Sequence, residues 1–452
     1  MPKLYAHQQL ALSRMIEKSM LLAADPGCGK TPVGLMLAQH FKAHPQRSGK
    51  TLVVAPLSLL EAAWVADAAT FTPGLRIASL WASTPQRRAK VLRDAADSDV
   101  YVVNPEGFKR IMQWLQAKKP DVLIIDESSM LANPRAQITK AVLKFAYDIP
   151  RVYTLSGTPM PNSPLDIWAQ VHICNHNLLP PNYYQFRARY GYATGYMNYE
   201  WRVSPESRDR LMQDIAPAAM FIAKKDCLDL PAQTYVTRRV YMSSAQRDAY
   251  DTMVRDKILP LIDGKSAIAS NVLAEIMKLR QITSGWLYDD QHQVYSFADT
   301  KAQVLDEVLA ELGDRQAIIW VQFIHDADEL TKRLNADHVQ AAKVIGGTSP
   351  TELNNILGAF RSGQYKYLVA HPKTIGHGVT LVNCSYAIFY SLSYSWQEWF
   401  QACCRIHRIG QHSPVEYISL VAHKSIDEVI YRAVQRKDNM AKAALEFLRE
   451  EM

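Results

Sequence analysis

Ala24-Asp25-Pro26-Gly27-Cys28-Gly29-Lys30-Thr31 stands between a short apolar run, Met20-Leu21-Leu22-Ala23, and a stretch of helical character at 33–39. A strand, a glycine-rich turn, Lys-Thr and a helix in this order predict a phosphate-binding loop. Its glycines let backbone N–H groups surround phosphate oxygens, and the helix N-terminus adds a favourable dipole. The generic pattern opens with Gly where this chain has Ala24, and an ordinary strand–turn–helix is the alternative.

The composition is that of an ordinary globular protein with more than one domain. With 452 residues the chain is too long for one core, while 48% hydrophobic and 21% charged residues are unexceptional. The net charge of +7 permits a nucleic-acid partner but does not argue for one, because Lys and Arg are spread along the chain. No apolar run approaches the roughly 20 residues of a membrane span, and the N-terminus lacks a signal-peptide pattern. Six scattered cysteines without a Cys-x-x-Cys pair fit a reducing cytoplasm, where we expect the protein to act.

The first half of the chain alternates short apolar strands with helices, which predicts a parallel sheet covered on both faces. After the first strand we expect strands at 51–55, 77–80, 100–103, 122–125 and 152–155. The carboxyl ends of such strands form the ligand crevice, so the residues directly after them are the candidate site. Periodicity weakens at about 175–230, which we interpret as a loop-rich insertion, and Asp229-Leu230-Pro231 is the expected domain boundary.

The second half predicts another open α/β domain, but one without a phosphate loop. Helices are expected at 245–262, 271–282, 326–334, 351–360, 396–406 and 426–448, and strands at 317–321, 367–370, 387–390 and 417–420. The fold class is therefore α/β, with two unequal halves of which only one carries the loop.

Two acids at the end of a strand form the second signal. Asp126 and Glu127 directly follow Val122-Leu123-Ile124-Ile125, which is the layout of a Walker B site. Asp126 would hold Mg²⁺, and Glu127 would orient and deprotonate an attacking water. Acids after a strand are also common as helix N-cap residues, which is the alternative interpretation.

Gln8 and two arginines complete the set of candidate residues. Gln8 belongs to a predicted amphipathic helix that begins near Leu4, and its amide carries both a donor and an acceptor for the edge of adenine. Arg405 and Arg408 lie three residues apart in the helix expected at 396–406 and just beyond it, so on a helix they would share a face. Two guanidinium groups can neutralise charge on a γ-phosphate, although a solvated basic face is the default for such a pair.

Together these residues resemble the Swi/Snf-type branch of the superfamily-two helicases, in the compact form of phages and bacteria. The matching stretches cover nearly the whole chain: the phosphate loop with Gln8, then 51–64, 104–108, 126–129, 155–163, 373–381 and 401–411. The run Arg405-Ile406-His407-Arg408-Ile409-Gly410-Gln411 is typical of this branch. The family usually has His at the position of Ser129, Gly at Ile375 and Asn at Thr380.

The resemblance implies two RecA-like lobes, 1–230 with the insertion at about 175–230 and 231–452, with ATP and Mg²⁺ between them. It implies catalytic roles for Lys30, Glu127, Arg405 and Arg408, ATP contacts from Gln8, Pro26, Gly27, Cys28, Gly29, Lys30, Thr31, Gly376 and Gly378, and Mg²⁺ contacts from Thr31 and Asp126. Residues expected to couple hydrolysis to DNA or to contact DNA are Ser58, Ser156, Thr158, Lys373 and Gln401.

The activity that the resemblance implies is ATP-driven translocation on double-stranded DNA, or its remodelling, without obligatory strand separation. Contacts would go mostly to the phosphate backbone, and a monomer could perform them. Two alternatives remain open: a strand-separating DNA or RNA helicase on the same scaffold, and a non-hydrolysing DNA-binding scaffold subunit. Intact Lys30, Glu127 and both arginines argue against the second alternative.

Overall fold

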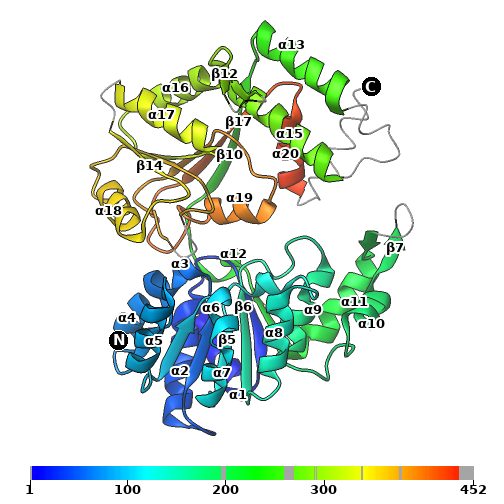
Figure 1. The fold of residues 1–452 in the computed structure, drawn as a ribbon, viewed down its shortest axis with the longest axis vertical. Coiled ribbons are helices and arrows are strands. Elements are labelled where there is room, and N and C mark those ends of the chain that lie inside the picture. The colour runs from blue at the N-terminus through cyan, green and yellow to red at the C-terminus, as the bar shows by residue number, and fades with distance from the viewer. Residues whose placement is uncertain are drawn as a thin grey trace. The chain divides into compact units, whose positions relative to one another are not determined.

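A computed structural model describes residues 3–194, 200–258, 269–289, 291, 293–336, 340–375 and 379–436. The chain divides into two compact units, 1–229 and 230–452, which we call the first and the second unit. Each unit is built on a parallel sheet with helices on both faces (Figure 1). The predicted α/β fold class is thereby confirmed. In the part of the chain that is described, no helix has the length and apolar character to cross a membrane.

The described part of the first unit holds a seven-stranded sheet in which every pairing is parallel. In spatial order its strands are β3 Ile77–Ser79, β4 Val100–Val103, β2 Thr51–Val54, β5 Val122–Ile125, β6 Arg151–Ser156, β1 Met20–Ala24 and β9 Ala219–Ile222. The helices are α1 Ala6–Glu17, α2 Lys30–Ala43, α3 Leu57–Leu59, α4 Ala66–Phe71, α5 Pro85–Asp94, α6 Pro105–Arg110, α7 Met112–Ala117, α8 Gln137–Ala146, α9 Trp168–His172, α10 Tyr183–Tyr190, α11 Pro205–Ile215 and α12 Lys224–Cys227. The strands expected in this half are confirmed, with shifts of a residue at some ends.

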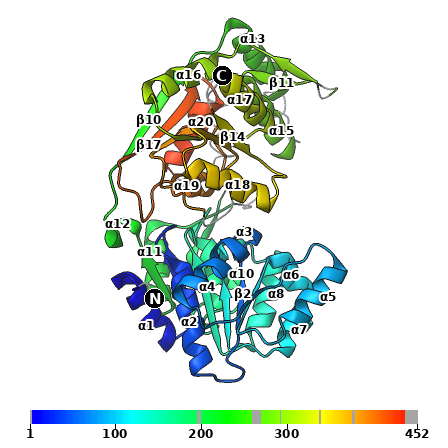
Figure 2. The same ribbon diagram turned by 90° about the vertical axis from the view of Figure 1, so that its left-hand side faces the viewer.

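Alternate residues of each strand pack on opposite faces of this sheet. Val53 and Ile124 face the core formed with α1, α2 and α4, whereas Leu52 and Leu123 face the core formed with α6, α7 and α8. Figure 2 shows the helices of this unit on both sides of its sheet. Because both faces are covered, the central strands are apolar throughout rather than alternating. This double burial explains why the sequence marks them so clearly.

The loop-rich interpretation of 175–230 is wrong. This region contains α10, the antiparallel hairpin of β7 Tyr192–Thr194 and β8 Glu200–Arg202, α11, β9 and α12. Strand β9 extends the main sheet by pairing in parallel with β1, with Leu22 opposite Met220. It lies at the edge of the sheet, where Phe221 is exposed, although all four of its residues are apolar.

The described part of the second unit holds a six-stranded parallel sheet. Its strands in spatial order are β10 Gln233–Val240, β17 Val415–Ala422, β16 Tyr386–Phe389, β13 Ala317–Trp320, β15 Tyr367–Ala370 and β14 Ala341–Val344, and a separate hairpin joins β11 Trp286–Tyr288 to β12 Val294–Ser296. The helices are α13 Ser244–Met253, α15 Ala269–Ser284, α16 Thr300–Leu312, α17 Ile324–Ala336, α18 Pro350–Arg361, α19 Trp396–Cys403 and α20 Ile426–Arg436. The expected strands and helices are found, but β10, β14, the hairpin of β11 and β12, and α16 were not anticipated. The part of the last expected helix beyond 436 lies outside the described residues.

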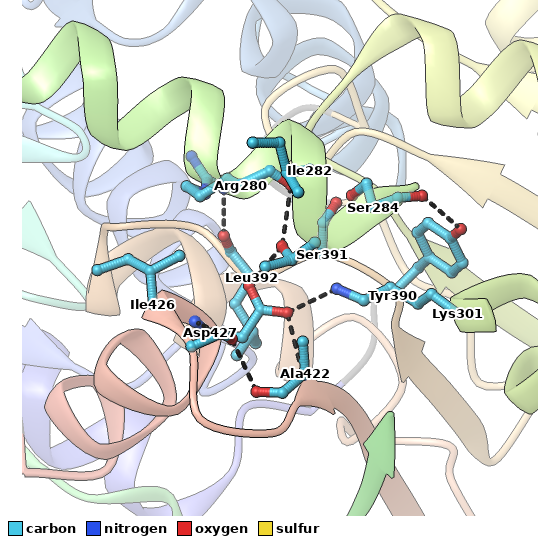
Figure 3. A network of polar contacts seen from close by, with 12 residues as sticks. Arg280, Ile282, Ser284, Lys301, Tyr390, Ser391, Leu392, Ala422, Ile426 and Asp427 are labelled. Carbon is cyan, nitrogen blue, oxygen red and sulfur yellow. Dashed lines mark hydrogen bonds and ion pairs between the residues drawn. The ribbon is translucent and has the colours of Figure 1, made fainter. Parts of the chain in front are cut away.

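A buried ion pair ties helices of the second unit to its sheet. Lys301 on α16 contacts Asp427 on α20 at 2.6 Å between Nζ and Oδ2, and the Lys301 side chain is 1% exposed (Figure 3). The other carboxylate oxygen of Asp427 accepts from the Thr283 hydroxyl at 3.0 Å. Nearby, the buried Arg280 guanidinium donates to the carbonyl of Leu392. Each of these buried polar groups therefore has a partner that compensates for lost hydration.

Candidate nucleotide site

The phosphate loop connects β1 to α2 and contains two glycines in left-handed backbone conformations. Gly27 has φ +96° and Gly29 has φ +75°. A Cβ atom on Gly29 would lie 2.1 Å from Gln8 Nε2, so a side chain there would strain the backbone and displace the Gln8 amide. The helix then begins at Lys30, which places its first N–H groups at the loop.

Gln8 supports the loop from α1. Its Nε2 donates to the carbonyl of Cys28 at 3.1 Å, while its Oε1 accepts from the backbone N–H of Tyr5 at 2.9 Å. The same Cys28 carbonyl lies 3.0 Å from Nε2 of His7. In this arrangement the Gln8 amide is buried and braces the loop.

Lys30 and Thr31 occupy the first turn of α2. The Lys30 ammonium donates to the carbonyl of Ala24 at 2.8 Å, which closes the loop on itself. Thr31 follows it on the helix and is half-buried. The Lys30 charge also acts on Asp126, whose pKa it lowers against the effects described next.

The acidic pair lies at the carboxyl end of β5. Asp126 is almost fully buried; its Oδ1 accepts from the backbone N–H of Glu127 at 2.9 Å, and its Oδ2 accepts from Nε1 of Trp64 at 2.9 Å. Burial, and then the neighbouring Glu127 charge, raise the pKa of Asp126 to about 6. Glu127 has φ +49°, a conformation that a non-glycine residue seldom adopts without a local reason. A carboxylate whose charge is costly in the protein alone is well suited to bind a cation.

Trp64 is a site residue that the sequence did not identify as such. It belongs to the stretch 51–64, one of those that carry the resemblance, and its side chain is completely buried. Its ring also lies against α2, because a Cβ on Gly34 would be 2.6 Å from Cη2 of Trp64. Apart from its place in that stretch, nothing in the local pattern signals the bond to Asp126, 62 residues away.

The segment after β6 packs directly against the phosphate loop. A Cβ on Gly157 would lie 2.9 Å from two ring carbons of Pro26, so the two loops meet without room for a side chain. Ser156 and Thr158 are buried, and the Ser156 hydroxyl accepts from the Thr158 N–H at 3.1 Å. The loops that follow β1, β5 and β6 thus come together at the carboxyl ends of the strands of the first sheet.

The two arginines of the second unit lie after α19 rather than on it. The expected helix through Ile406 is wrong at its end, because α19 stops at Cys403, whose carbonyl accepts from the Tyr417 hydroxyl at 2.9 Å. Arg405 is buried, and its carbonyl accepts from the Leu381 N–H at 3.0 Å. Arg408 donates from Nη1 to the carbonyl of Val379 at 3.0 Å. Arg405 and Arg408 therefore do not share the face of a helix, contrary to the prediction from the sequence.

Two neighbours of the arginines hold this turn in place. The Gln411 amide donates to the carbonyls of Cys384 at 2.9 Å and Ile406 at 3.1 Å. His407 is buried with Nε2 2.9 Å from the carbonyl of Pro231 and Nδ1 next to the Gln233 amide. The predicted ATP contacts Gly376 and Gly378 lie outside the described residues.

The remaining predicted residues differ in exposure. Ser58 is exposed on α3 in the first unit. In the second unit, Lys373 is exposed and forms an ion pair with Glu398 at 3.0 Å, and Gln401 is half-buried on α19.

Comparison with known protein families matches residues 7–285 to the SNF2-related domain and residues 300–410 to the helicase conserved C-terminal domain. The chain belongs to the SNF2 family. The assignment confirms the resemblance seen in the sequence.

Two relatives illustrate the range of the family. The chain is 25% identical to the putative protein p41 of Acyrthosiphon pisum secondary endosymbiont phage 1, over 99% of this chain and 98% of that protein. It is 24% identical to an uncharacterised ATP-dependent helicase of Mycoplasma genitalium, over 94% of this chain but only 40% of the relative's length. Among solved structures, the helicase domain of Pyrococcus furiosus Hef matches 96% of this chain and 98% of its own with a TM-score of 0.53 at 14% identity, which supports the fold alone.

Proposed function

We propose that this SNF2-family chain couples ATP hydrolysis to movement along double-stranded DNA without obligatory strand separation. The observation that carries the proposal is the junction in the first unit, where Gly157 packs on Pro26 and Lys30 acts electrostatically on Asp126. A movement of the phosphate loop would therefore displace the segment after β6, which packs directly against it. Such a link is what a motor needs to convert hydrolysis into movement.

The residues at this junction fit ATP and Mg²⁺. The side-chain-free backbone at Gly29 and the start of α2 provide donors for phosphate oxygens, and Lys30 provides a cation. Thr31 and the buried Asp126 would hold Mg²⁺, which when bound neutralises charge on the β- and γ-phosphates. Glu127 would orient the attacking water and accept its proton.

Arg405 and Arg408 would complete the site from the second lobe. Guanidinium groups that meet the γ-phosphate only when two lobes close make hydrolysis depend on closure. In this proposal 1–230 acts as the ATP-binding lobe and 231–452 as the lobe that carries the arginines. Gly376 and Gly378 would approach the nucleotide from that second lobe.

Contact with DNA would be mostly with its phosphate backbone. Ser58 and Lys373 are exposed and can reach a backbone, whereas the buried Ser156 and Thr158 are better placed to relay a change than to bind DNA in this conformation. Gln401, which is half-buried, is also proposed to couple hydrolysis to DNA. Backbone contacts give binding that is salt-sensitive and largely independent of sequence.

ATP turnover with and without duplex DNA tests the proposal. We expect duplex to stimulate turnover in the wild type and Lys30→Ala to abolish it. Displacement of a third strand from a triplex, without unwinding of a forked duplex, would support translocation without strand separation. Efficient fork unwinding would instead support a strand-separating helicase, and absence of ATP turnover in the wild type would support a scaffold subunit.

A further inference from the structure

A fully buried glutamine joins the loop after β5 to the loop after β6. Gln170 on α9 accepts at Oε1 from the Ser128 hydroxyl at 2.8 Å. Its Nε2 donates to the carbonyls of Pro159 at 2.6 Å and Asp166 at 3.0 Å. One side chain thus contacts the residue after the acidic pair and the residue after Thr158.

The orientation of this amide follows from its partners. Backbone carbonyls accept hydrogen bonds and cannot donate them, so the NH₂ group must face Pro159 and Asp166. The amide oxygen then faces Ser128, whose hydroxyl must be the donor. The main-chain carbonyl of Gln170 also accepts from the Thr154 hydroxyl at 3.0 Å, which anchors the residue to β6. Ser128 and Pro159 are therefore linked through a side chain with no unused donor on its nitrogen.

The two linked loops carry groups that would act on different ligands. Ser128 follows Asp126 and Glu127, whereas Pro159 follows Thr158, whose buried hydroxyl has no hydrogen-bond partner among the described residues. A buried hydroxyl without a partner is costly, and a rearrangement that supplies one is favoured. The family usually has His at the position of Ser129. The contacts through Ser128 and Gln170 do not involve residue 129, so they do not require that imidazole.

We propose that Gln170 is a positioning residue that couples the acidic pair to the Ser156-Gly157-Thr158 segment. The proposal rests on the proposed function, because coupling matters only in a chain whose hydrolysis responds to DNA. Movement of the backbone at Glu127 during hydrolysis is transmitted by the Ser128 hydroxyl to the Gln170 amide, and from there to the Pro159 carbonyl.

Three variants test the role of Gln170. Gln170→Leu removes the amide at similar volume, and we expect duplex-stimulated kcat to fall about tenfold while KM for ATP stays within about twofold. It also leaves the Ser128 hydroxyl without its acceptor, so Tm should fall. Combining it with Ser128→Ala removes that orphaned group, and we expect Tm to recover in part while stimulation stays low. Ser128→Ala alone keeps both carbonyl contacts of Gln170 and should lower stimulation in the same direction, which preserves the test if Gln170→Leu does not fold.

Thr139→Val is the matched control. The Thr139 hydroxyl is buried in the same unit and donates at 2.8 Å to the carbonyl of Asn133. Asn133 lies further along the segment between β5 and α8 and is not a partner of Gln170. We expect this variant to lower Tm and keep stimulation. Stimulation that survives in Gln170→Leu, or that recovers together with Tm in the double variant, would overturn the coupling role. A wild-type chain that duplex does not stimulate would refute the proposed function instead.

Discussion

Replacing Trp64 by Phe should shift the pH dependence of ATP turnover to higher pH. The indole Nε1 donates to Oδ2 of Asp126 at 2.9 Å, and this bond favours the charged carboxylate. Phe keeps an aromatic side chain but has no N–H, and it lacks the outer ring atoms Cη2 and Cζ3 that lie against Gly34. Burial and Glu127 already raise the pKa of Asp126 to about 6, so removing the donor raises it further. Only the ionised carboxylate can hold Mg²⁺, and activity is therefore lost as pH falls through this pKa.

The size of the shift follows from the hydrogen bond that is lost. A hydrogen bond to a charged group contributes about 1.5–3 kcal/mol, and water or relaxation recovers part of it. The lower end corresponds to about one pKa unit. At pH 7 the ionised fraction of Asp126 would then fall from about nine tenths to about one half. Turnover near neutral pH should drop by about half, and the acid limb should move up by about one pH unit.

The assay is a profile of kcat/KM against pH for the wild type and two variants. Trp286→Phe is the matched control, because Trp286 Nε1 donates at 2.7 Å to Asp326, another buried carboxylate whose pKa burial raises to about 6. That pair lies in the second unit and has no proposed role in hydrolysis. An acid limb that moves equally in both variants, or in neither, would refute the reasoning.

The other predictions concern the second unit and the cysteine pair. Arg408→Ala should lower duplex-stimulated turnover about 10³-fold and retain ATP binding, as measured by nucleotide fluorescence beside turnover. Lys301→Met breaks the buried pair with Asp427 and should cost about 3–5 kcal/mol in denaturant unfolding. Adding Asp427→Leu should recover only part of it, because Asp427 also accepts from the Thr283 hydroxyl and the Ala422 N–H. Cys28 and Cys227 have their sulfurs 3.8 Å apart, and peroxide should join them slowly, because burial raises the pKa of the Cys28 thiol to about 12. Two thiols and one hydrogen peroxide give a disulfide and two waters. ATP turnover should fall on oxidation and return with dithiothreitol, and in Cys227→Ser peroxide should leave it unchanged.

The strands of the two main sheets that the sequence missed are β9, β10 and β14, and all three lie at sheet edges. The central strands β2, β5, β13 and β15 were all anticipated, as was the edge strand β3, whereas the strands of the two separate hairpins were not. A central strand is covered on both faces and must be apolar throughout, whereas an edge strand can keep side chains in solvent, as β10 does. β10 has mostly exposed or half-buried residues, among them Tyr235 and Arg238, and its composition therefore resembles a loop.

The same distinction between local and distant information separates the predicted from the unpredicted parts of the site. The phosphate loop and the acidic pair are read from neighbouring residues, since a strand, its last residue and the following turn are continuous in sequence. The side chains that contact these motifs cannot be read from neighbouring residues. Trp64 donates to Asp126 across 62 residues, and Gln170 accepts from Ser128 across 42. The end of helix α19 also has a distant partner, because the carbonyl of Cys403 accepts from the Tyr417 hydroxyl, 14 residues further along the chain. A motif thus predicts which carboxylate would hold Mg²⁺, but the pH at which it could do so depends on a donor that only the folded chain brings to it.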